Sequence, residues 1–129
     1  MPALAGFHHV KIPVADVDKS LEWYQRVLGL QVAIEFVEDG VRRGVALRDP
    51  GGTLMLALRQ DPDHAGALTG FDPVAFAVPD VAALRDWVAH LDELGIAHGP
   101  LAEGSVGWLA GGVTDPDGIE VRLYTATPR

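Results

Sequence analysis

An internal repeat that spans nearly the whole chain constrains the fold more than any other feature of the sequence. The segment VKIPVADV at 10–17 returns as VAFAVPDV at 74–81, and the turn DPGG at 49–52 returns as DPDG at 115–118. Matched landmarks in the same order indicate the duplication of one structural unit. Because each half is too small to be stable alone, we expect a single pseudo-symmetric domain over residues 1–129.

The first half begins with a strand and a helix. Residues alternate with period two in HHVKIPV, so His9 and Lys11 share one face of a half-buried strand. Asp16 or Asp18 is placed to cap the helix that follows, which runs to Leu28 and ends at a glycine. This pattern predicts a strand followed by an amphipathic helix.

Turn residues then separate three further strands. The Asp39-Gly40 pair lies between QVAIEFVED and VRRGVALRD, as in a hairpin, and the turn at 49–52 leads to the apolar strand TLMLAL. The predicted order is therefore strand, helix and three strands in each half, with modules at about 7–59 and 72–125. The segment QDPDHAGALTG lacks periodicity, and we expect a linker over about 60–70.

Composition narrows the class of protein and of partner. The chain has 129 residues, 48% of them hydrophobic, which suits one compact core. Its net charge of −8 repels phosphate backbones and anionic membrane surfaces, so we expect neither a nucleic acid nor a membrane as partner. Cysteine is absent, and no apolar run reaches the length of a membrane span. A soluble, cytoplasmic protein is expected.

These motifs together resemble the vicinal oxygen chelate superfamily, which includes glyoxalase I, extradiol dioxygenases, fosfomycin-resistance enzymes and bleomycin-resistance proteins. The motifs that carry the resemblance are HHVKIPVADVDKSLEWYQRVLGL, LRDPGGTLMLAL, FAVPDV, LDELGI and TDPDGIEVRLY. The resemblance implies an α+β fold of two tandem βαβββ modules whose curled mixed sheets surround a shared cavity. It also implies a homodimer and, in the enzymes, a divalent metal such as Zn, Ni, Mn or Fe.

The resemblance places the metal positions of the family at His9, Leu56, Pro73 and Arg122. His9 is a competent ligand, whereas leucine and proline side chains have no donor and a guanidinium is an obligate cation. Glu120 lies two residues before Arg122, about 6.6 Å along the strand, which is too far for a metal–oxygen bond of roughly 2.0–2.2 Å. We therefore expect no metal cofactor, with a divalent metal as the alternative. Four further histidines show no ligand spacing: His8, His64, His90 and His98.

A pocket with apolar walls and a few polar groups is the expected binding site. Arg122 either clamps an anionic group of a ligand or pairs with Glu120, and Trp108 either forms a ligand wall or packs in the core. His9 and Glu120 are the candidate acid–base pair. The candidate ligand-binding residues are Lys11, Leu56, Trp108, Arg122 and Tyr124.

Three functions follow from these expectations. The first is a metal-free module that binds a small organic molecule in the cavity between the modules, as the bleomycin-resistance branch implies. The second is an enzyme of the glyoxalase (lyase) or extradiol dioxygenase type, either metal-dependent or metal-free. The third is a structural or regulatory domain whose cavity is filled by its own side chains.

Overall fold

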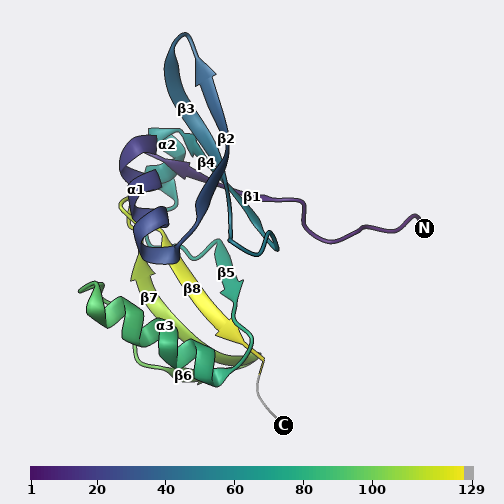
Figure 1. Ribbon diagram of the computed structural model, residues 1–129, viewed down its shortest axis with the longest axis vertical. Coiled ribbons are helices and arrows are strands. Elements are labelled where there is room, and N and C mark those ends of the chain that lie inside the picture. The colour runs from purple at the N-terminus through teal and green to yellow at the C-terminus, as the bar shows by residue number, and fades with distance from the viewer. Residues whose placement is uncertain (127–129) are drawn as a thin grey trace. The chain divides into compact units, whose positions relative to one another are not determined.

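The computed structural model describes residues 1–126 and divides into two compact units, one of residues 1–67 and one that begins at Leu68. The first unit contains β1 (Val10–Val14), α1 (Val17–Leu28), β2 (Gln31–Glu38), β3 (Val41–Arg48), β4 (Met55–Gln60) and α2 (Pro62–Ala67). The second contains β5 (Val74–Ala77), α3 (Val81–Glu93), β6 (Ala102–Gly104), β7 (Gly107–Thr114) and β8 (Glu120–Thr125) (Figure 1). The predicted βαβββ order is confirmed in both units.

Both units have the same sheet topology. The strand order is β1-β4-β3-β2 in the first sheet and β5-β8-β7-β6 in the second. The first and last strands of each module pair in parallel, and the remaining neighbours are antiparallel. The α+β class, the mixed sheets and the duplication that the sequence predicts are therefore confirmed.

The helix starts follow from the sequence. Asp16, rather than Asp18, caps α1: its side chain accepts hydrogen bonds from the backbone N–H groups of Asp18 (3.0 Å) and Lys19 (3.2 Å). Asp80 caps α3 in the same way, by accepting from the N–H of Ala83 at 2.7 Å. These bonds satisfy N–H groups that have no partner inside a helix.

Each sheet is packed against a helix on one face. In the first unit α1 contacts β3 and β4, and in the second unit α3 contacts β7 and β8 (Figure 1). The core of the second unit is built on Val78, Leu84, Ala110 and Leu123. The face of each sheet opposite its helix is called the open face below. Among residues 1–126 no helix is long and apolar enough to cross a membrane.

The segment predicted to be a linker at about 60–70 contains the boundary between the two units and also a short helix, α2, which the sequence analysis did not predict. Pro62 is the first residue of α2, where its fixed φ is favourable and its missing N–H is not needed. The carboxylate of Asp61 accepts from the N–H of His64 at 3.2 Å, and its carbonyl accepts from the N–H of Ala65 at 3.0 Å. A helix of six residues is too short to show an apolar period in the sequence.

The two DPxG turns differ in length, and this difference sets the register of the strands that follow. β4 begins six residues after Asp49, whereas β8 begins five residues after Asp115. The Asp49 carboxylate accepts from the N–H groups of Thr53 (2.7 Å) and Leu54 (3.0 Å), which orders the additional residue. Since strand side chains alternate between faces, one additional residue exchanges the two faces of β4 relative to β8.

His98 lies between two hydrogen-bond acceptors in the second unit. Its Nδ1 is 2.6 Å from the carbonyl oxygen of Gly99, and its Nε2 is 2.6 Å from Oδ1 of Asp92. Only the imidazolium carries a proton on both nitrogens. The Gly99 carbonyl, followed by the Asp92 carboxylate, therefore raises the pKa of His98 above its ordinary value.

We predict that Asp92→Asn reduces the pH dependence of stability. A raised pKa in the folded state adds stability below the unfolded pKa of about 6.5, and this contribution is lost as pH rises through the folded value. The urea midpoint of the original protein should therefore fall more than that of the variant between about pH 6 and pH 8. Equal falls in both proteins would contradict the prediction.

Candidate functional site

The open face of the first sheet displays a row of side chains that crosses all four strands. Lys11 of β1 pairs with Ala57 of β4, Ala57 pairs with Ala46 of β3, and Ala46 pairs with Ile34 of β2. Residues paired across neighbouring strands project to the same face of a sheet. The row therefore places one cation and one large apolar side chain on either side of two alanines.

A second row lies beside the first. Arg59 pairs with Pro13 on one side and with Gly44 on the other, and Gly44 pairs with Phe36. A Cβ atom at Gly44 would lie only 2.9 Å from the carbonyl oxygen of Leu58, so glycine permits the close approach of β3 and β4 here, whereas Cδ2 of Phe36 would be at an ordinary contact distance of 3.6 Å. Phe36 and Ile34 are 45% and 47% exposed, which is unusual for large apolar side chains that share one face.

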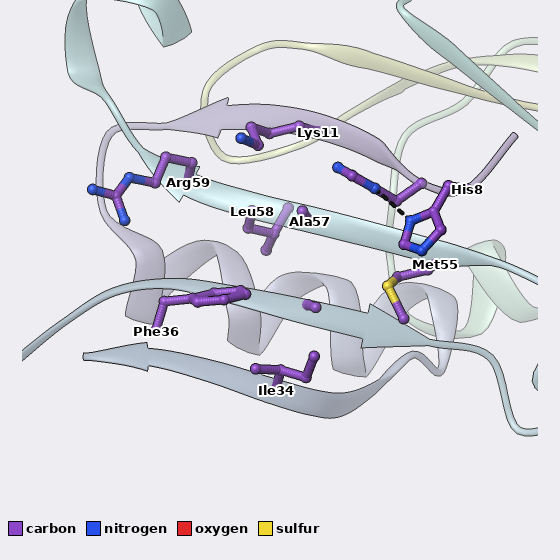
Figure 2. A pocket seen from close by; sticks show the side chains of 10 residues that line it. His8, Lys11, Ile34, Phe36, Met55, Ala57, Leu58 and Arg59 are labelled. Carbon is purple, nitrogen blue, oxygen red and sulfur yellow. Dashed lines mark hydrogen bonds between the residues drawn. The ribbon is translucent and has the colours of Figure 1, made fainter. Parts of the chain in front are cut away.

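These rows form the walls of a pocket of about 330 Å³. Figure 2 shows Lys11, Ile34, Phe36 and Arg59 on the near face of the sheet, with a helix behind the strands. The lining is apolar apart from four basic side chains, and it contains no carboxylate. The residues that line it are His8, His9, Lys11, Ile34, Phe36, Ala46, Met55, Ala57, Leu58 and Arg59.

Two adjacent histidines lie at this pocket, although the sequence predicts that only His9 faces it. Nδ1 of His8 is 2.9 Å from Nδ1 of His9, and the two rings meet edge to face. His8 precedes β1 and is not bound by the strand alternation, so its ring also lines the pocket. The two rings share one proton between their Nδ1 atoms.

The open face of the second sheet carries a different set of polar groups. It borders a pocket of about 640 Å³, to which Arg122 and Tyr124 of β8 both contribute. Their strand partners on β5 are Ala75 and Ala77. The residues that line this pocket are Asp72, Ala75, Ala77, Val78, Pro79, Val106, Arg122, Tyr124, Thr125 and Ala126.

Arg122 is held by two carboxylates. Its Nε donates to Oε2 of Glu120 at 2.7 Å, and its Nη1 lies 3.3 Å from Oδ2 of Asp72. The hydrogen bond to Glu120 is the largest cause that raises the pKa of Arg122 above its ordinary value. Of the two uses that the sequence leaves open for Arg122, the structure shows the ion pair with Glu120.

Glu120 is fully engaged within its own unit. Besides the bond to Arg122, its Oε1 accepts from the backbone N–H of Gly112 at 2.8 Å. Gly112 belongs to an irregularity in β7, where the register shifts between Ala110 and Val113, and its φ is +72°. The Glu120 carboxylate therefore stabilises a β-bulge, while His9, its predicted catalytic partner, belongs to the first unit.

Two predicted ligand-binding residues do not lie on an open face. Leu56 is 1% exposed and alternates with Ala57, so its side chain lies on the helix side of the sheet; the additional residue after the DPGG turn causes this difference. Trp108 pairs with the buried Thr125 and packs against the core of the second unit. For Trp108 the packing alternative therefore holds.

The corrected register also moves one of the implied metal positions. Ala57 pairs with Lys11 as Arg122 pairs with Ala75, so Ala57 and not Leu56 is the counterpart of Arg122. A methyl side chain has no donor, so the four positions still offer His9 alone. Within the residues described, no three His, Asp or Glu side chains of either unit gather to hold a metal ion. The residues present do not fit the metal of the enzymes in this superfamily.

Sequence reasoning missed the largest apolar residues of the first pocket. Ile34 and Phe36 come from β2, Met55 comes from β4, and none was a candidate. The alternation in QVAIEFVE does place Ile34 and Phe36 on one face of the strand. The pattern does not indicate which of the two faces of a hairpin strand is covered and which borders a pocket.

Two curated proteins of Bacillus subtilis (strain 168) are similar in sequence. Catechol-2,3-dioxygenase is 29% identical over 127 residues, or 94% of this chain and 41% of that protein. The putative ring-cleaving dioxygenase MhqA is 28% identical over 106 residues, or 76% of this chain and 33% of that protein. The chain thus spans a third to two fifths of the length of these relatives.

A solved structure of similar fold is that of TnmS3, described as an antibiotic binding protein from Streptomyces sp. CB03234. It has a TM-score of 0.75 and 23% sequence identity, and the match covers 97% of this chain and 100% of that one. The family model described as Glyoxalase/Bleomycin resistance protein/Dioxygenase superfamily matches residues 6–123. The chain belongs to this superfamily, as its repeated βαβββ units and their mixed sheets also indicate.

Proposed function

We propose that this protein binds a small organic molecule in the pocket on the open face of its first unit, without the divalent metal of the family's enzymes. The observation that carries the proposal is the composition of that pocket. A volume of about 330 Å³ with an apolar lining and few polar groups is typical of a site for a compact organic ligand.

The exposure of the lining supports this assignment. Ile34 and Phe36 keep nearly half of their surface accessible on the open face, although burial of such side chains is favourable by about 1.5–3 kcal/mol each. An apolar ligand that covers them recovers part of this free energy. The pocket of the second unit is less apolar, because its lining includes the ion pair of Arg122 with Asp72.

The same fold occurs in TnmS3, which is described as an antibiotic binding protein, and this supports a binding role for such a fold. Because that likeness shows only the fold, the class of ligand has to be argued from the pocket itself. The apolar rows of the first sheet favour a ligand with one or two rings or a short branched chain.

The alternative is an enzyme, either a ring-cleaving dioxygenase, which the two Bacillus relatives suggest, or a lyase of the glyoxalase type. His9 stands at a ligand position that the resemblance implies, and its contact with His8 provides a proton donor and acceptor. The donor set is nevertheless short of the three protein ligands that a stable site usually has, because Ala57, Pro73 and Arg122 occupy the other positions. A catalytic role for His9 would therefore have to be metal-free.

We predict that the purified protein carries no Zn, Ni, Mn or Fe in stoichiometric amount, because three of the four implied positions lack a donor. Elemental analysis after dialysis against each metal checks this. His9→Ala should leave the metal content unchanged. One equivalent of metal that disappears in His9→Ala would overturn the metal-free proposal.

We also predict that Phe36→Ala weakens the binding of N-phenyl-1-naphthylamine, a neutral aromatic fluorophore, by about tenfold, since it removes a large apolar wall. Fluorescence titration measures the effect. Val37→Ala is the matched control, because Val37 is an exposed apolar residue of the same strand that does not line the pocket. Equal affinities of the two variants would locate binding elsewhere.

A further inference from the structure

The pocket of the first unit is basic, although the chain as a whole is acidic. Its lining includes His8, His9, Lys11 and Arg59 but no aspartate or glutamate. The chain carries 18 acidic and 10 basic side chains, for a net charge of −8. The pocket is therefore a locally basic region in an acidic chain.

The guanidinium of Arg59 is already neutralised. Its Nη1 lies 2.8 Å from Oε1 of Glu38, and its Nη2 donates to Oε2 of the same carboxylate at 3.1 Å. This bidentate contact is also the largest cause that lowers the pKa of Glu38. Arg59 therefore contributes little net charge to a ligand in the pocket.

The ammonium of Lys11 has no such counter-ion. Among the described residues of the first unit, no carboxylate lies within ion-pair distance of it, whereas Arg26, Arg42 and Arg59 each pair with at least one. Lys11 stands next to Ala57 in its row, and the methyl side chain leaves the space beside it open. Lys11 is one of only two lysines in the chain.

The histidine pair adds a second donor at the same pocket. In the contact between the two Nδ1 atoms of His8 and His9, one ring donates and the other accepts. The ring that accepts at Nδ1 must carry its own proton on Nε2, because a neutral imidazole has one N–H. The pair therefore always keeps one N–H that is not used in the contact between the rings.

The corresponding face of the second unit has the opposite character. There the one cation, Arg122, contacts both Glu120 and Asp72, so the group carries a net negative charge. Among the described residues that line the two pockets, the first pocket thus has a cation without an ion pair beside an apolar wall, whereas the cation of the second pocket is paired.

We propose that the pocket of the first unit selects organic anions, that is, a compact aromatic or branched aliphatic body with a carboxylate or sulfonate. The apolar body lies against Ile34, Phe36 and Met55, and the anionic group lies at Lys11 and the free N–H of the histidine pair. This inference rests on the proposed function, since it names the class of ligand for the same pocket.

A pair of fluorophores that differ in one sulfonate tests the proposal. 8-Anilinonaphthalene-1-sulfonate carries the anion, and N-phenyl-1-naphthylamine is the same aromatic body without it. We expect the sulfonate probe to bind more tightly, and Lys11→Met to weaken it by about fivefold or more. The same variant should leave the neutral probe unchanged, since it keeps the length of the apolar stem.

Lys19→Met is the matched control, because it removes the other lysine, an exposed residue of α1 that does not line the pocket. Binding of the sulfonate probe should be unchanged by this variant. A higher salt concentration should weaken the binding of the sulfonate probe to the original protein and leave the binding of the neutral probe unchanged.

Three results would overturn the proposal. If both probes bind equally and Lys11→Met affects neither, the pocket does not select anions, although loss of both in Phe36→Ala would still support a binding pocket. If neither probe binds, both the anion selectivity and the proposed function fail. If sedimentation shows a dimer that Phe36→Ala dissociates while probe binding persists, the open face is an interface between two copies of the chain.

Discussion

The parallel pairing of the first and last strands of each unit is the constraint on which the remaining features depend. It brings β1 beside β4 and β5 beside β8, so that residues far apart in the sequence share one row of the sheet. Because side chains alternate along a strand, the register of this pairing decides which residues face the helix and which face outward. A shift of this register by one residue would place Leu56 on the open face instead of Ala57.

The two units have the same backbone fold but carry different polar side chains on their open faces. Their strand order, the parallel pair at one edge of each sheet and the aspartate helix caps are the same. The polar groups on the open faces differ, with an unpaired ammonium at Lys11 in one unit and an ion-paired guanidinium at Arg122 in the other. The backbone hydrogen bonds of the sheets do not depend on these side chains, so the open faces are free to diverge.

The loss of the metal donors and the apolar lining of the first pocket support the same proposal. In a metal enzyme of this superfamily, the ion would supply the strongest local charge of the site. Alanine, proline and arginine stand at three of the implied donor positions, and under the proposed function the first pocket uses apolar contact together with Lys11 and the histidine pair. Such a site suits selective binding more than activation of a ligand.

Much of the fold could be predicted from the sequence, because it follows from local patterns. The repeat, the Asp39-Gly40 hairpin, the Asp16 cap and the common face of His9 and Lys11 all depend on residues close in the chain. Period, capping and turn chemistry are short-range properties. The candidate site was only partly predictable. Four of its residues were candidates for contact with a ligand, but in the structure Lys11 and Arg122 lie on open faces, whereas Leu56 and Trp108 lie on the helix side of their sheets.

Only the tertiary structure decided which residues that are far apart in the sequence lie side by side. The additional residue before β4 emerges only from the strand bounds and the pairing with β1, and it decides which face of the sheet Leu56 lies on. The ion pairs of Arg59 with Glu38 and of Arg122 with Asp72 join residues about 20 to 50 positions apart, and no local pattern encodes them. The sequence by itself determined the duplicated frame, and it predicted that three of the four implied metal positions have no donor. The structure decided how the cations at the two pockets are paired, because the pairing of charges depends on distances in space.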